Sequence, residues 1–281
     1  MKKKLAMVLL AAMTTGATLT GCGGSKETAA TGAAEEAAAG TEGKTAGAGM
    51  VYAVEAGSAG EEAAQEKGFQ TNAVASQADA LMEVASGTSD AAIIDLLMAG
   101  AMIGEGTSYP DLVHTDELTT EEYGVGCRKD SDLASYINAV FAESYADGSM
   151  QETAETYGVQ EALIEQKASE FTASTSESDV AYIQGKGSLI VGITEFEPMD
   201  YKDDSGNWIG FDADMARIVA DKLGVEAQFV VIDWDNKIME LDSKNIDVVW
   251  NGMTLTSEVT ESMECTNAYC NNAQVVVVPG K

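Results

Sequence analysis

Between residues 189 and 256, the hydrophobic positions change from a strand pattern to a helix pattern and back. Residues 189–193 form a short apolar run with the length of a buried strand. After a polar turn, a helix is predicted from residue 211 to 223, with Asp in its first turn and Gly224 just past its end. Its apolar face consists of Phe211, Met215, Ile218, Val219 and Leu223. Two more strands, 227–232 and 246–250, flank a short helix, so the pattern predicts a βαβαβ unit.

A second set of strands and helices is predicted from residue 51 onward. Residues 51–55 read as a strand, and the following turn leads into a helix near Glu61 with Ser58 as its N-cap. A strand at 69–75, a helix at 77–86 and a buried strand that ends at Asp95 follow. The stretch from Met82 to Asp90 is echoed by the stretch from Met239 to Asp247, as expected of two lobes with the same plan.

The N-terminal segment predicts export. Residues 1–21 carry three lysines, an apolar run and a small-residue end, which is typical of a signal peptide. The tetrapeptide 19–22, Leu-Thr-Gly-Cys, resembles the lipobox of bacterial lipoproteins and implies a lipid on Cys22 that anchors the chain to a membrane. The alternative is an ordinary cleavage site beside a chance cysteine. Residues 22–49 are then the lipidated cysteine and a disordered tether, because Ala, Gly, Thr and Glu bury little apolar surface.

Composition excludes some classes of function. The chain has 16 basic and 46 acidic residues and a formal net charge of −30, which makes nucleic acid an unsuitable partner. Apart from Cys22, three cysteines remain, of which Cys265 and Cys270 either pair or stay as small buried thiols. With a single histidine and no Cys-x-x-Cys motif, no metal or other cofactor is expected.

Three motifs in the C-terminal part carry a resemblance to a known family. They are the Gly-Phe-Asp-Ala-Asp run at 210–214, Trp-Asp at 234–235, and Gly-Met-Thr-Leu-Thr at 252–256. Together they resemble the first lobe of the polar-amino-acid solute-binding proteins of ABC importers. The resemblance implies an α/β fold of two lobes, each an open sheet flanked by helices.

The order of the segments differs from that family. There lobe one comes first, lobe two follows, and a return strand with closing helices ends the chain. Here residues 50–120 resemble lobe two, 121–166 the return strand and closing helices, 167–180 a Ser/Thr-rich linker, and 181–281 lobe one. We interpret this order as a circular permutation, which surface connections tolerate. It predicts one remaining covalent crossing near residues 122–126 and lobes that move more freely.

The resemblance also nominates the residues of a binding site between the lobes. They are Glu195, Phe196, Trp234, Asn251, Gly252, Met253 and Thr254 from lobe one, and Ser58, Ala59, Gly60 and Asp95 from lobe two. It implies that Asp95 pairs with a substrate ammonium, while Thr254 and backbone groups near Gly252 bind a carboxylate. The simpler alternatives are capping for Ser58 and Asp95, and core packing for the two aromatic residues.

One position departs from the family pattern. Members that bind α-amino acids carry an Arg after the Thr-x-Glu motif, and here Val259 follows Glu258. Losing that charge-assisted pair removes about 1.5–3 kcal/mol of binding. The ligand is therefore either an amino acid held by backbone N–H groups or a molecule without that carboxylate.

The expected function is a lipid-anchored extracytoplasmic receptor that captures a small polar solute and presents it to the membrane permease of an ABC importer. An amino acid is the expected solute class, and no enzymatic activity is expected. One alternative is a sensor lipoprotein without a role in transport, or a rearranged paralogue that no longer binds. Another is a dehydratase on the same fold, with Glu195 as its acid or base.

Overall fold

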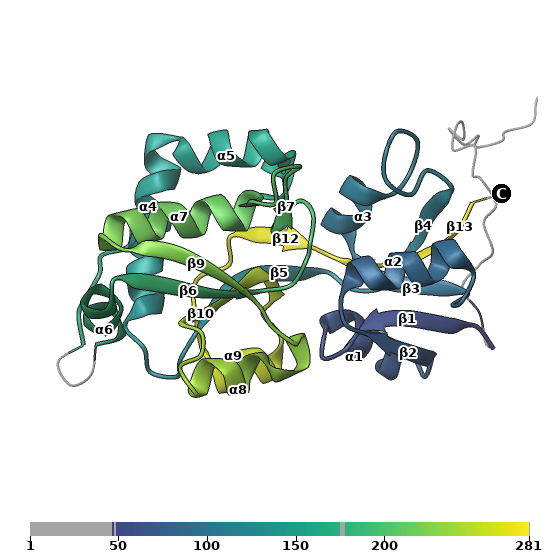
Figure 1. Ribbon diagram of the computed structural model, residues 1–281, viewed down its shortest axis with the longest axis horizontal. Helices are drawn as coiled ribbons and strands as arrows, with labels where there is room; N and C mark the ends of the chain where they lie inside the picture. The colour runs from purple at the N-terminus through teal and green to yellow at the C-terminus, as the bar shows by residue number, and fades with distance from the viewer. Residues whose placement is uncertain (1–46, 48, 175–177, 281) are drawn as a thin grey trace, which may run out of the picture. The chain divides into compact units, whose positions relative to one another are not determined.

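The computed structural model describes residue 47, residues 49–174 and residues 178–280 (Figure 1). The predicted signal peptide, Cys22 and nearly all of the tether lie outside these residues. The described residues belong to one compact unit, Thr41–Lys281. None of their helices is long and apolar enough to cross a membrane. The unit contains two α/β lobes, in agreement with the fold class expected from the sequence.

The lobe that comes first in the chain corresponds to the predicted lobe two and is called the first lobe from here on. It is built on a five-stranded sheet in the order β2-β1-β3-β13-β4. Its strands are β1 (Val51–Glu55), β2 (Gln70–Val74), β3 (Ala91–Asp95), β4 (Leu112–Glu117) and β13 (Gln274–Pro279). Its helices are α1 (Ala59–Glu66), α2 (Gln77–Ser86) and α3 (Leu96–Met102). The strands β2, β1 and β3 run parallel, and all five residues of β3 are buried. A strand buried on both faces is typical of a parallel sheet covered by helices.

The second lobe in the chain contains most of the predicted lobe one. It is built on a sheet in the order β11-β5-β10-β6-β9, with β12 also paired to β5. Its strands are β5 (Glu121–Cys127), β6 (Ser188–Ile193), β9 (Glu226–Val231), β10 (Val248–Thr254), β11 (Glu264–Cys265) and β12 (Cys270–Asn272), beside the hairpin of β7 (Tyr201–Lys202) and β8 (Trp208–Ile209). Its helices are α4 (Leu133–Asp147), α5 (Ser149–Tyr157), η1 (Gln160–Ala162), α6 (Asp179–Lys186), α7 (Phe211–Leu223), η2 (Trp234–Asn236), α8 (Lys237–Asp242) and α9 (Ser257–Ser262).

The predicted βαβαβ unit is confirmed. Helix α7 buries Phe211, Met215, Val219 and Leu223 at the predicted spacing and ends at Gly224, which adopts a left-handed conformation. The following strands, β9 and β10, lie within a few residues of the predicted positions. The second and third strands each lie beside β6, as the strand order requires.

The strand β13 corrects two expectations. Its residues 274–277 pair antiparallel with β3, and the same strand also pairs with β4, so residues 274–279 belong to the sheet of the first lobe (Figure 1). The chain therefore crosses between the lobes twice, at residues 118–120 and again at Ala273. The physical reason is that the backbone N–H and C=O groups of four buried valines need hydrogen-bond partners, which β3 and β4 supply on the two edges of the strand. The expectation of a single crossing is wrong, and the prediction of freer lobe motion loses the observation on which it was based.

Both sheets follow the same order. In the first lobe, β1 lies between β2 and β3, and β13, which arrives from the other lobe, lies next to β3. In the second lobe, β6 lies between β9 and β10, and β5, which arrives from the other lobe, lies next to β10. This common plan agrees with the echo between the α2–β3 segment and the α8–β10 segment. It also places the carboxyl ends of β1, β3 and β10 near the two crossings, where open α/β sheets bind ligands.

The three cysteines in the described residues are free thiols. Cys127 and Cys270 are buried, and Cys265 is half-buried. Burial raises the pKa of the Cys265 thiol to about 11 and that of the other two well above the usual range. They are packing residues, in line with the second of the two alternatives.

Candidate functional site

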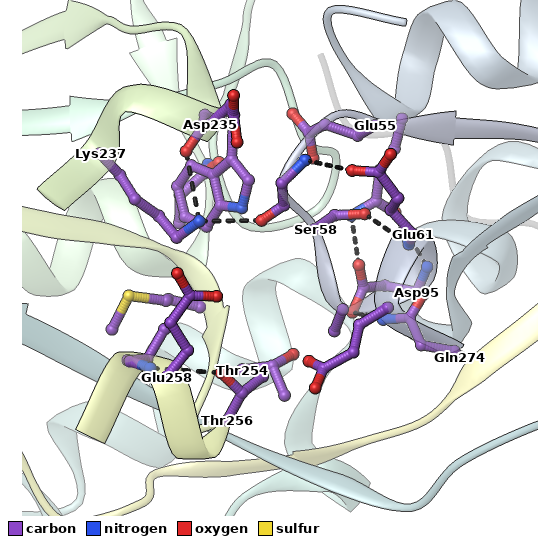
Figure 2. A pocket seen from close by; sticks show the side chains of 18 of the residues that line it. Glu55, Ser58, Glu61, Asp95, Asp235, Lys237, Thr254, Thr256, Glu258 and Gln274 are labelled. Atoms are coloured by element: carbon purple, nitrogen blue, oxygen red, sulfur yellow. Dashed lines mark hydrogen bonds between the residues drawn. The ribbon is translucent and has the colours of Figure 1, made fainter. Parts of the chain in front are cut away.

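A cavity of about 350 Å³ lies between the two lobes (Figure 2). Its walls are the β1–α1 turn, the ends of β3 and β10, the segment η2–α8, the start of α9 and the first residue of β13. Seven of the residues nominated from the sequence line it: Ser58, Ala59, Asp95, Trp234, Asn251, Met253 and Thr254.

The β1–α1 turn is closed by reciprocal capping bonds. The Ser58 Oγ accepts a hydrogen bond from the Glu61 backbone N–H at 3.1 Å, and the Glu61 carboxylate accepts one from the Gly57 N–H at 2.8 Å. This is a variant of the capping box in which Glu61 bonds the residue before the N-cap, so two N–H groups that a ligand carboxylate would seek are already bonded within the protein. Ser58 therefore acts as a helix cap in this structure.

Asp95 is surrounded by donors. Its side chain is 3 % exposed, and its Oδ1 accepts hydrogen bonds from the Tyr123 hydroxyl at 2.6 Å and from the Gln274 Nε2 at 3.1 Å. The side-chain amides of Gln77 and Asn272 also donate to its carboxylate. Burial raises the pKa of Asp95 well above its usual range, and the nearby Glu121 carboxylate raises it further. Asp95 lines the cavity, but its oxygens are occupied by protein donors.

The donors to Asp95 connect both crossings. Asn272 and Gln274 come from the second crossing, and their amides also donate to the Glu121 Oε1 at 2.6 and 2.7 Å. Glu121 and Tyr123 lie on β5, directly after the first crossing. The carboxylates of Asp95 and Glu121 thus join the two connections between the lobes through one hydrogen-bond network.

Glu55 has the opposite environment at the end of the adjacent strand. It is 3 % exposed and lines the cavity, yet its Oε1 has no hydrogen-bond donor in the described part of the protein. Burial raises the pKa of Glu55 to about 8, and this shift is opposed first by the Thr194 side chain and then by the Lys237 ammonium and the Gln77 side chain. A buried carboxyl oxygen without a donor carries a desolvation cost, which a suitable ligand would relieve.

Lys237 joins the two lobes across the cavity. Its Nζ donates to the Gly57 carbonyl at 2.8 Å and to the Trp234 carbonyl at 3.3 Å, and lies 5.1 Å from the centre of the Trp234 ring. Burial lowers its pKa. The aromatic face of Trp234, expected to receive a ligand, is thus occupied by this lysine. In Figure 2, Lys237 and Glu258 lie opposite Glu61 and Asp95.

Four nominated residues do not line the cavity. Glu195 is exposed elsewhere, and Phe196 is 2 % exposed and packs edge-on against Tyr123. The Gly252 N–H donates to the Asp212 carboxylate at 2.7 Å, and Gly60 packs against β3 and Gln274. The expectation that backbone groups near Gly252 bind a ligand carboxylate therefore has no support in this arrangement.

The side-chain amide of Asn251 is also saturated by internal bonds. Its Oδ1 accepts from the Thr194 N–H and hydroxyl at 2.9 and 2.7 Å, and its Nδ2 donates to the Thr194 carbonyl and the Asp200 carboxylate at 3.0 and 2.8 Å. Asn251 lines the cavity but fixes the end of β6 to the end of β10. Of the nominated residues from the second lobe, Met253 and Thr254 also line the cavity.

The wall also contains residues that the sequence analysis missed. Glu55, Glu61, Glu62, Asp235, Lys237 and Glu258 supply nearly all of its charge. With Asp95, the lining holds six carboxyl groups and one ammonium, and no Arg or His. Val259 is 4 % exposed and lines the cavity where the family resemblance places an Arg. A Glu at the end of an apolar strand, directly before a glycine-containing turn, was the signal available for Glu55.

The chain is similar to bacterial binding proteins over its C-terminal third. Residues 189–281 match the model of the family described as bacterial extracellular solute-binding proteins, family 3. The L-cystine-binding protein TcyJ of Escherichia coli (strain K12) is 34 % identical over 88 residues, which are 31 % of this chain and 33 % of that protein. The arginine-binding extracellular protein ArtP of Bacillus subtilis (strain 168) is 33 % identical over 94 residues, 33 % of this chain and 36 % of that protein.

Two further similarities extend this picture. The cyclohexadienyl dehydratase of Pseudomonas aeruginosa is 30 % identical over 83 residues, 29 % of this chain and 31 % of that enzyme. The crystal structure of a Phe57Trp mutant of the arginine-bound form of domain 1 from TmArgBP is 33 % identical and covers 36 % of this chain and 84 % of that chain, with a TM-score of 0.32. The chain spans about a third of the length of the curated relatives it matches.

Proposed function

We propose that this chain is an extracytoplasmic solute-binding protein of an ABC importer, which captures a small polar solute between its two lobes. The observation that carries the proposal is the cavity at the carboxyl ends of β1, β3 and β10, lined from both lobes. Its volume of about 350 Å³ suits a molecule of amino-acid size, and sites of this kind are formed at such strand ends. The match of residues 189–281 to a solute-binding family supports the same role.

The expected mode of action is capture by lobe closure. The contact between Lys237 and the Gly57 carbonyl joins the lobes on one side of the cavity, and the two crossings join them on another. A solute that touches both walls stabilises the closed arrangement, because it binds that arrangement better than an open one. The closed form is then the one that a membrane permease recognises.

The relatives suggest the class of solute. These proteins bind cystine and arginine, so an amino acid or a close derivative is the class to test first. The nominated residues Ser58, Ala59, Trp234, Met253 and Thr254 remain candidates for direct contact, because they line the cavity. Asp95 is proposed as a support for the cavity wall.

Residues 1–46 suggest where the protein works. A signal peptide and a lipid on Cys22 would place it outside the cytoplasm, anchored to the cell membrane. Replacing Cys22 with Ala is expected to move the protein from the membrane fraction into the medium or periplasm, measured by fractionation and immunoblotting. Retention in the membrane fraction would argue against the anchor.

The lobe order supports a circular permutation as a second element of the proposal. β13 joins the sheet of the first lobe beside β3, and β5 joins the sheet of the second lobe beside β10. The lobes are therefore joined by two crossings, although their order along the chain is the reverse of the order in the family. A rearranged chain with residues 178–281 before residues 50–166 is expected to fold and bind the same solute. If the rearranged chain shows no cooperative unfolding transition, the interpretation as a circular permutation is contradicted.

A dehydratase is the weaker candidate. One relative is an enzyme of this kind, but Glu195, the acid or base considered for it, is exposed and does not line the cavity. We therefore propose binding without catalysis.

A thermal-shift screen of the purified full chain against amino acids, amines, small peptides and organic acids tests the proposed function. A solute well above its Kd raises the melting temperature by mass action on the folded state. The expected result is at least one solute whose shift follows its concentration. A cooperative unfolding transition that no solute moves would overturn the receptor and favour a sensor or non-binding paralogue.

A further inference from the structure

We propose that the solute is a dication without a carboxylate, such as an α,ω-diamine or a short polyamine, with one ammonium bound to Glu55. This inference rests on the proposed receptor function and replaces an amino acid, as its solute, with a derivative that lacks the carboxylate. It depends on which polar groups around the cavity are already hydrogen-bonded within the protein and which are not.

The first step is the unsatisfied oxygen of Glu55. This side chain is almost fully buried, lines the cavity, and leaves its Oε1 without a donor in the described residues. An alkylammonium has three N–H donors and a charge that favours the ionised carboxylate. A ligand ammonium is therefore the group that completes this site.

The second step is that the lining, in the described part of the chain, has no free cation to neutralise a ligand carboxylate. The single ammonium in the lining, on Lys237, is bonded to the Gly57 and Trp234 carbonyls. The N–H groups of Gly57 and Glu61 are bonded within the capping box, and Asn251 is saturated. A carboxylate in this cavity would face six carboxyl groups without a free cation to neutralise it.

The third step is the presence of acidic groups on both walls. Glu55, Glu61 and Glu62 come from the first lobe, and Asp235 and Glu258 come from the second. Because negative charge faces the cavity from two sides, a molecule with an ammonium at each end is better matched than one with a single charge. Methylene groups between the two charges then lie along Met253 and Val259.

The decisive experiment compares 1,5-diaminopentane with L-lysine on the purified full chain by isothermal titration calorimetry. The two molecules differ in one carboxylate, so their ratio isolates its effect. We expect the diamine to bind about tenfold more tightly or better, and pentylamine, which lacks the second charge, to bind more weakly than the diamine. Lysine binding as tightly as the diamine would overturn the inference and leave the receptor function standing.

Two variants and a control locate the charges. Glu55→Gln keeps the shape of the side chain and is expected to weaken diamine binding about tenfold or more, and Glu258→Gln tests the opposite wall. Glu155→Gln removes an exposed carboxylate of α5 and is the matched control. A Glu55→Gln protein that binds the diamine as well as the unchanged chain would overturn the assignment of Glu55.

Proton release provides a readout that is independent of affinity. Because burial raises the pKa of Glu55 to about 8, this carboxyl is largely protonated at pH 7 in the empty cavity and ionises when an ammonium binds. Titrations in buffers with different ionisation enthalpies are expected to show protons released on diamine binding, and none with Glu55→Gln. Binding of neutral or anionic solutes alone would overturn the ligand class, whereas no binding of any solute would overturn the receptor itself.

Discussion

Glu55 and Asp95 end adjacent parallel strands of one sheet, and both are 3 % exposed, yet they differ in how far protein donors satisfy their oxygens. Asp95 accepts hydrogen bonds from four side chains, whereas one oxygen of Glu55 accepts none from the described residues. Burial and position at a strand end are therefore insufficient to identify a ligand-binding carboxylate. The number of protein donors already bonded to it separates a supporting group from one that awaits a ligand.

The difference follows from where each strand ends. β3 ends beside β13, so Asp95 meets amides and a hydroxyl from both crossings between the lobes. β1 ends one strand further from the crossings, beside the turn that forms the cavity wall. Asp95 stabilises the connection between the lobes, and Glu55 contributes an acceptor to the cavity.

The largest expected effect comes from removing the better-bonded carboxylate. Asp95→Ala leaves several buried donors without an acceptor and is expected to lower the free energy of unfolding by about 4 kcal/mol. Chemical denaturation measures this loss. Asp95→Asn retains one acceptor oxygen and should cost clearly less. A loss below about 1 kcal/mol for Asp95→Ala would mean that the network at the crossings contributes little.

The next effect concerns the pH dependence of stability. The pKa of Glu55 in the folded protein is raised to about 8 by burial. The side chains of Thr194, Lys237 and Gln77 oppose this shift, and Asp79 adds to it. In the unfolded chain the carboxyl ionises from about pH 4.5, so stability is lost as pH rises from about 4.5 to about 8, by at most about 1.4 kcal/mol per pH unit.

Glu55→Gln removes this dependence and is the way to measure it. Thermal unfolding of both proteins between pH 5 and pH 8 should show their melting temperatures diverging, with the variant more stable at the upper end. Other buried acids, such as Asp212 with a pKa raised to about 7, act equally in both proteins and cancel in the difference. Parallel curves would contradict the unsatisfied environment of Glu55.

A smaller effect tests the contact between the lobes. Gly57 has φ +69°, and a Cβ there would lie 2.7 Å from the Asp235 Cα, whereas Gly68 has φ +68° and open space around it. Both Ala variants should lose about 1 kcal/mol of stability from the left-handed backbone. Only Gly57→Ala is expected to weaken solute binding, by about tenfold, measured by calorimetry. Equal affinities would show that closure does not require this contact.

The smallest effect comes from Lys237. Its ammonium opposes the rise in the pKa of Glu55, so Lys237→Gln should raise that pKa further. The pH at which diamine binding releases protons should move upward. A downward shift would mean that the lysine acts on Glu55 mainly through packing.

The sequence was sufficient where the information is local. Helix α7 was predicted because its apolar face and its glycine end lie within 14 residues, Phe211 to Gly224. The sheet that β13 joins was not predicted, because its partners β3 and β4 lie far away in the chain. A run of valines specifies a buried strand but not its neighbours.

The same distinction between local and long-range information applies to the cavity residues. The sequence placed Asp95 at a strand end, but its donors lie 18 to 179 residues away in the chain, so its saturation was not predictable. The lack of a donor at Glu55 is likewise a property of the tertiary structure. The Val259 position was recognised from the family motif, because that motif is contiguous in the chain.

The place of β13 has a consequence for the order in which the molecule assembles during synthesis. Among the strands that the structure describes, β4 is hydrogen-bonded into its sheet only through β13, and β13 is translated more than 150 residues after β4. Until residue 279 has left the ribosome, the edge of β3 and the whole of β4 lack their partner strand. The first lobe to be translated is thus the last to be completed, and its exposed edge is open to mispairing throughout the translation of the second.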